Sequence, residues 1–217
     1  MPRNDGVAVL PPDGRVTPMT QREPSETRIL TVASEHLRRF GLKRFTVVAV
    51  AEEAGMTHAN VYRYFPSRAA LVDAVVDVWL KATERHLADI ADGPDPADDK
   101  LERLILALAK ANRDLLTEEP HLFAALSQAV AKRHAISRRN RARVRALFER
   151  VIDEGIASGT FEPRDRDRAI AFVIDATHRF IHPAALELES DVPQASVDIR
   201  LSTLIRVSLR VLIAGIV

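Results

Sequence analysis

The sequence contains no cysteine among its 217 residues. Disulfide bonds, cysteine-ligated zinc sites and thiol catalysis are therefore excluded, and the composition is consistent with a reducing compartment. No uncharged apolar run approaches the length of a membrane span, and the first 25 residues lack the apolar segment and cleavage site of a secretory signal. We therefore expect a cytoplasmic protein that does not enter a membrane.

Several motifs of enzymes are also missing from the chain. There is no glycine-rich phosphate loop, no Gly-x-Ser-x-Gly and no His-Glu-x-x-His, so we predict that the protein is not an enzyme. The net charge is only +1, which gives no global argument for nucleic acid. Between Arg22 and Arg68, however, eight lysines and arginines stand against five acidic residues, a local surplus that suits phosphate binding.

Apolar residues recur at helical spacing along most of the chain, and no stretch of useful length alternates with period two. The pattern predicts an all-α protein of about nine helices. Residues 1–24 are rich in Pro, Gly, Asp and Arg without any period, which predicts a flexible N-terminal arm. A helix over 165–182 is expected to continue, kinked, beyond Pro183, and the last helix reaches the C-terminus.

Residues 45–71 carry the most informative local pattern, two short helices joined by a glycine turn and followed at once by a third. Thr46 and Thr57 are each placed to cap a helix, and Gly55 suits the left-handed residue between them. Val61 and Phe65 are four residues apart and face back into a small core. A short helix with a polar N-terminal half, held across a glycine turn, can lie in a DNA major groove.

Residues 28–72 resemble the DNA-binding domain of the tetracycline-repressor (TetR) family of bacterial transcriptional regulators. The matching features are the apolar series Ile29, Leu30, Ala33, Leu37 and Phe40, then Gly41, Thr46, Ala51, Ala54-Gly55-Met56-Thr57, Val61-Tyr62, Tyr64-Phe65, Ser67-Arg68 and Leu71. The resemblance implies a three-helix helix-turn-helix domain over residues 25–66. It also implies a helical ligand-binding and dimerisation domain over residues 67–217, whose first helix connects the two.

The resemblance also assigns DNA contacts residue by residue. It implies phosphate contacts for Thr46, Thr57, Tyr62, Tyr64 and Arg68, two of which lie beside the free N–H groups of a helix start. Positions that face base edges are His58, Ala59, Asn60 and Arg63. Arginine can bond guanine bidentately, and an alanine methyl can touch that of thymine.

The second domain offers weaker signals. Asp175, His178 and His182 share one face of the helix over 165–182. Three interpretations are open: these side chains line an effector pocket, they hold a divalent metal, or they form a polar seam at the dimer interface or ordinary capping and salt-bridge contacts. We predict that the protein holds neither a metal nor a cofactor. Phe123, Phe148 and Phe172 belong to the core or face a cavity.

The last two long helices are apolar on more than one side, which favours burial against a second copy of the chain. We therefore predict a homodimeric, ligand-responsive repressor that binds a palindromic operator in double-stranded DNA and is released by a small-molecule effector. The alternative is a constitutive architectural DNA-binding dimer with no effector. A ligand cavity bounded by the first, second, fourth and fifth helices of the second domain would favour the ligand-responsive repressor.

Overall fold

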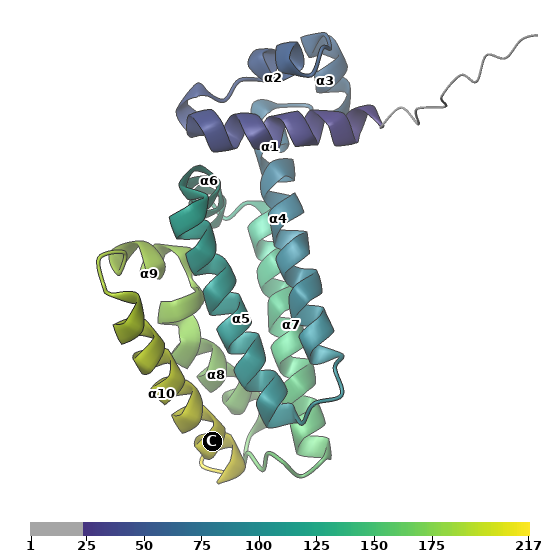
Figure 1. Cartoon of the computed structure of the whole chain (residues 1–217). Coiled ribbons are helices and arrows are strands. Elements are labelled where there is room, and N and C mark those ends of the chain that lie inside the picture. The colour runs from purple at the N-terminus through teal and green to yellow at the C-terminus, as the bar shows by residue number, and fades with distance from the viewer. Residues whose placement is uncertain (1–23) are drawn as a thin grey trace, which may run out of the picture.

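The computed structural model describes residues 24–217, so the arm predicted over 1–24 lies, except for Pro24, outside the described residues. The described part is all-helical and contains no strand. Its ten helices are α1 (Ser25–Arg44), α2 (Val47–Glu53), α3 (His58–Tyr64), α4 (Arg68–Ala91), α5 (Ala97–Glu118), α6 (Pro120–Ala131), α7 (Ala135–Ala157), α8 (Arg166–Ile181), α9 (Pro183–Leu188) and α10 (Gln194–Ile213). Figure 1 shows α2 and α3 on the far side of α1 from the remaining helices.

The short helices begin where the sequence predicts. The Thr46 hydroxyl accepts a hydrogen bond from the Ala49 N–H at 3.1 Å, and the Thr57 hydroxyl accepts one from the Asn60 N–H at 3.3 Å. Each bond satisfies one of the free N–H groups of a helix start. Gly55 lies between the two helices with φ of +62°, which a residue without a Cβ adopts freely.

Gly41 interrupts α1 with φ of +66°, directly after Phe40. A Cβ at this position would lie 2.8 Å from Nδ1 of His121 on α6, so glycine also permits close contact between α1 and α6. The side chains of Arg38 on α1 and Glu119, directly before α6, form an ion pair at 2.9 Å in the same region. The helix-turn-helix part is thus attached to the second domain by α6 as well as by α4.

The chain continues beyond α8 as a separate helix rather than as one kinked helix. His182 has φ of −90° and ψ of 128°, which is extended backbone, and α9 then begins at Pro183. The proline ring disfavours helical geometry in the residue before it, which explains the break. This extra element accounts for ten helices where the sequence predicts about nine.

Buried side chains form two clusters, which we call the upper and lower cores. The upper core joins the helix-turn-helix residues to α6 and to the first half of α4. Leu80 is the last residue of α4 in this core. The lower core begins at Leu87 and contains residues of α4, α5, α7, α8 and α10. No residue from Lys81 to His86 is buried, so α4 passes from one core to the other along a stretch that belongs to neither.

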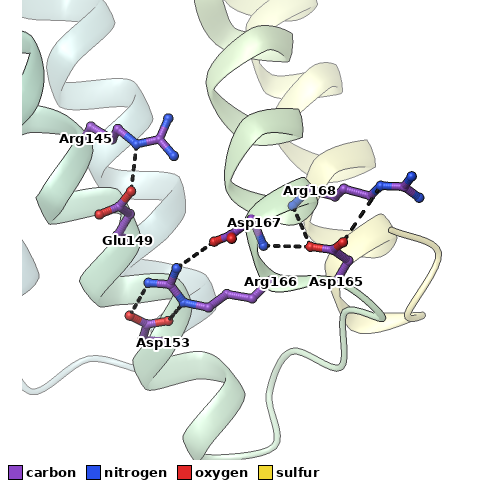
Figure 2. Close-up of polar contacts among 7 residues, drawn as sticks. All are labelled: Arg145, Glu149, Asp153, Asp165, Arg166, Asp167 and Arg168. Carbon is purple, nitrogen blue, oxygen red and sulfur yellow. Dashed lines mark hydrogen bonds and ion pairs between the residues drawn. The ribbon is translucent and has the colours of Figure 1, made fainter.

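An ion-pair network fixes α7 against the start of α8 (Figure 2). Arg166 Nη2 donates to Asp153 Oδ2 at 2.7 Å, while Arg166 Nη1 donates to Asp167 at 2.9 Å. The Asp165 carboxylate caps α8 by accepting from the N–H groups of Asp167 and Arg168, each at 3.0 Å. The hydrogen bonds from Arg166 hold the pKa of Asp153 below its ordinary value.

Candidate DNA-binding surface and effector domain

Helix α3 has one buried side and one open side. Val61 is fully buried and Phe65, directly after the helix, is 6% exposed, so both anchor α3 to the upper core. The side chains predicted to contact DNA lie on the remainder of its surface. His58, Ala59, Tyr62 and Arg63 are exposed, while Asn60 and Tyr64 are half-buried. Because α3 lies at the end of the molecule away from the helical bundle, this open side is free to enter a groove (Figure 1).

Arg63 and Tyr64 interact with each other in the DNA-free protein. Arg63 Nη2 donates to the Tyr64 hydroxyl at 3.0 Å, and the guanidinium carbon lies 5.0 Å from the centre of the tyrosine ring. Hydrogen bonds from Arg63 and Ser25 hold the pKa of the Tyr64 phenol below its ordinary value. A base contact by Arg63 would require this hydrogen bond to break or to be shared.

The guanidinium of Arg68, unlike that of Arg63, donates to backbone carbonyls. Its Nε donates to the backbone carbonyl of Phe45 at 2.7 Å, and its Nη2 donates to the carbonyl of Leu42. Both acceptors lie in the segment between the main part of α1 and α2, which also presents Thr46. The Nη1 group remains available to a phosphate, so Arg68 both positions this segment and supplies charge.

The predicted pocket residues do not come together at one place. Phe123 is buried in the upper core, whereas Phe148 is buried in the lower core and Phe172 packs against its edge. Of the polar face on α8, Asp175 and His178 are exposed and His182 is half-buried. Between residues 24 and 217, no group of three His, Asp or Glu side chains is arranged to hold a metal ion.

The two imidazoles of this face are in contact. The rings of His178 and His182 stack with their centres 4.5 Å apart. Burial lowers the pKa of His182, and the neighbouring positive charges of His178 and Arg141 lower it further.

Two hollows lie away from all of the predicted pocket residues. The larger has a volume of about 430 Å³ and lies between α5 and α10; the smaller, of about 70 Å³, lies among α5, α8, α9 and α10. Neither lies between α4, α5, α7 and α8, where a cavity would favour the ligand-responsive hypothesis. Arg113 lines both hollows, and no sequence signal identified it because it stands among ordinary charged residues of an amphipathic helix.

No described helix is both long and apolar enough to cross a lipid bilayer.

Comparison with known proteins identifies both parts of the chain. Residues 29–75 match the family described as "Bacterial regulatory proteins, tetR family", and residues 97–196 match "Tetracyclin repressor-like, C-terminal domain". The chain is 28% identical over 175 residues to the HTH-type transcriptional repressor KstR2 of Mycolicibacterium smegmatis, covering 75% of this chain and 81% of that protein.

Solved structures share the fold. A regulator of the TetR/AcrR family from Thermobifida fusca matches with a TM-score of 0.64 and 21% identity, over 86% of this chain and 97% of that one. RolR in complex with resorcinol matches with a TM-score of 0.58 and 18% identity, over 86% and 88%. The chain belongs to the TetR family and is a DNA-binding transcriptional regulator of the ligand-responsive repressor type.

Proposed function

We propose that the protein binds a palindromic operator as a homodimer, represses transcription there, and is released when a small molecule binds the second domain. The open side of α3 carries this proposal, since His58, Ala59, Asn60 and Arg63 lie on it while Val61 anchors the helix from behind. In this proposal those four side chains face base edges. Thr46, Thr57, Tyr62, Tyr64 and Arg68 contact the phosphates. Its site of action is the cytoplasm.

The outer surface of α10 supports dimerisation. Ile199 is 68% exposed, and Val207 and Ile213 are each 48% exposed, although all three are apolar. Exposed apolar side chains gathered on one helix indicate a surface that another protein covers. A second copy of the chain covers it with the same surface, which gives the two-fold symmetry that a palindromic operator requires. The Asp175, His178 and His182 face of α8 then forms a polar seam beside it.

The effector would act by geometry. Two recognition helices must lie about one DNA turn apart, roughly 34–36 Å, to enter successive major grooves. A small molecule that binds better to a conformation with another spacing lowers operator affinity by the difference between its two affinities. RolR, which shares the fold, has been solved with resorcinol, and we extend to this chain only the inference that the second domain takes a small molecule.

Selection of bound fragments from random DNA, followed by sedimentation of two variants, tests the proposal. Val207→Arg places an unpaired charge in the proposed interface and should yield monomers that lose tight operator binding. Val78→Arg is the matched control, because Val78 is 50% exposed on α4, outside that surface. Sedimentation of the unaltered protein as a monomer at micromolar concentration would refute the dimer. Operator binding that no compound in a broad screen weakens would favour the architectural alternative.

A further inference from the structure

A groove runs along the side of the second domain between α5 and α10. The hollows of about 430 and 70 Å³ share three lining residues, Arg113, Thr117 and Gln194, so they adjoin each other. The larger one is within the size range of small-molecule sites, roughly 300–1,000 Å³. Besides the shared residues, the larger hollow is lined by three apolar residues, Leu106, Ala109 and Leu201, and by three charged ones, Lys110, Asp114 and Asp198. The apolar side chains of the groove include Leu106, Ala109, Leu116, Phe180, Leu186 and Leu201.

Arg113 lies at the junction of the two hollows with an unsatisfied guanidinium. Its side chain is 14% exposed, and its Nη1 atom is buried without a hydrogen-bond partner. Arg113 Nη1 forms an ion pair with Oδ1 of Asp198 at 3.6 Å, which is too long for a hydrogen bond. Asp198 instead accepts a hydrogen bond from Gln194 at 2.7 Å, and its side chain is 57% exposed. A buried cationic donor left in this way is costly unless an acceptor completes it.

The other charges around the groove have strong partners. Glu189 pairs with both Arg179 and Arg200. Lys110 pairs with Asp114 at 2.6 Å. Arg113 is therefore the lining cation best placed to take a new anion. The carboxylates of Asp114 and Asp198 border the same groove and would repel a ligand with two negative charges, so a single charge fits best.

We infer that this groove binds a small organic monocarboxylic acid, with the carboxylate on Arg113 and the apolar body along Leu106, Ala109 and Leu201. A guanidinium fork matches a carboxylate in geometry, and the apolar floor gains from the burial of hydrocarbon. The inference rests on the proposed function, because it names the chemical class of the effector. It places that effector between α5 and α10, outside the α4, α5, α7 and α8 bundle.

Calorimetric titration with two acids and their neutral analogues tests the assignment. The probes are octanoate and phenylacetate, compared with octan-1-ol and phenylacetamide. At least one acid should bind the unaltered protein and raise its melting temperature. Arg113→Met, which keeps the side-chain bulk without the charge, should weaken acid binding about tenfold or more and leave binding of the neutral analogue unchanged. Arg113→Lys should retain part of the acid affinity.

Arg103→Met is the matched control, because Arg103 also lies on α5 but pairs with Asp95 away from the groove. It should bind the acids as tightly as the unaltered protein. Equal acid affinity in Arg113→Met and the unaltered protein would overturn the inference, as would the failure of both acids to bind below about 10 mM. Operator binding without acid is measured in parallel on the same proteins. If the unaltered protein binds its operator but neither acid, the inference about the groove is refuted and the proposed function stands. If the unaltered protein binds no operator, the proposed function is refuted.

Discussion

Arg68 provides a sharp test of the DNA-binding surface because it combines two separable roles. Its Nε and Nη2 groups hold the carbonyls of Phe45 and Leu42, and its Nη1 group is left for a phosphate. Arg68→Ala removes both roles. Arg68→Lys keeps the positive charge but has no planar fork with which to hold two carbonyls at once.

The expected magnitudes differ for the two roles. A hydrogen bond from a charged donor contributes about 1.5–3 kcal/mol where water is excluded, but Arg68 is exposed, so we expect about 1–2 kcal/mol for both bonds together. In a chain of this length that corresponds to roughly 2–8 °C in melting temperature. Each phosphate contact contributes about 0.9 to the slope of log affinity against log salt, so two half-sites give about 1.8.

Urea denaturation and operator binding at several salt concentrations measure these quantities. Both variants should lose similar stability, because both lose the carbonyl fork. Only Arg68→Ala should flatten the salt dependence, since Arg68→Lys still carries charge to the phosphate. An unchanged salt slope in Arg68→Ala would refute the phosphate contact. Unchanged stability in both variants would refute the role in positioning the segment between α1 and α2.

Three further changes have distinct readouts. Arg63→Ala should lower discrimination at one base pair of each half-site by about 1–3 kcal/mol, measured on singly substituted operators, and an equal loss on every sequence would contradict base reading. Gly155→Ala should cost about 1–3 kcal/mol in urea denaturation, since its Cβ would overlap the Phe161 ring; unchanged stability would show that the ring moves freely. Because the pKa of His182 is lowered in the folded chain, stability should fall as pH drops below about 6.5, where the unfolded chain takes up the proton more readily. His182→Gln should reduce that fall, and an unaltered pH profile would contradict the assignment.

Local features of the helix-turn-helix were predictable because the residues that determine them are adjacent in sequence. A threonine before an apolar helical pattern can satisfy the free N–H groups of the next turn whatever the rest of the chain does. Thr46 and Thr57 do so at 3.1 and 3.3 Å. Gly55 at positive φ follows from the same local logic, because other residues pay a steric cost there. The start of α3, directly after Thr57, could therefore be predicted to within one residue.

Features that depend on distant contacts were not predictable in this way. The spacing of apolar residues on α4 predicts an inward band made of Leu71, Val75, Trp79, Ala82 and Ile90. Ala82 is nevertheless exposed, because it falls between the two cores. Arg113 likewise owes its unsatisfied position to the packing of α5 against α10 and to Gln194, which bonds Asp198 instead. Periodicity shows which side of a helix is apolar, but not which neighbour covers each turn.

The division of the core changes how an effector signal can reach the DNA. The family resemblance makes α4 the connection between the two domains, but α1 to α3 share the upper core with α6, with the first half of α4 and with single residues of α5, α7 and α9. The ion pair of Arg38 and Glu119 and the contact of Gly41 with His121 further tie α1 to α6. No residue of α4 from Lys81 to His86 is buried, but Glu84 in this stretch accepts hydrogen bonds from Asn140 and Arg143 of α7. A ligand bound to α5 would act on a helix that begins in the lower core. The same helix ends at Glu118, two residues before α6 begins at Pro120. A shift of α5 along its axis would move α6, and with it the whole helix-turn-helix unit, without requiring α4 to bend within either core.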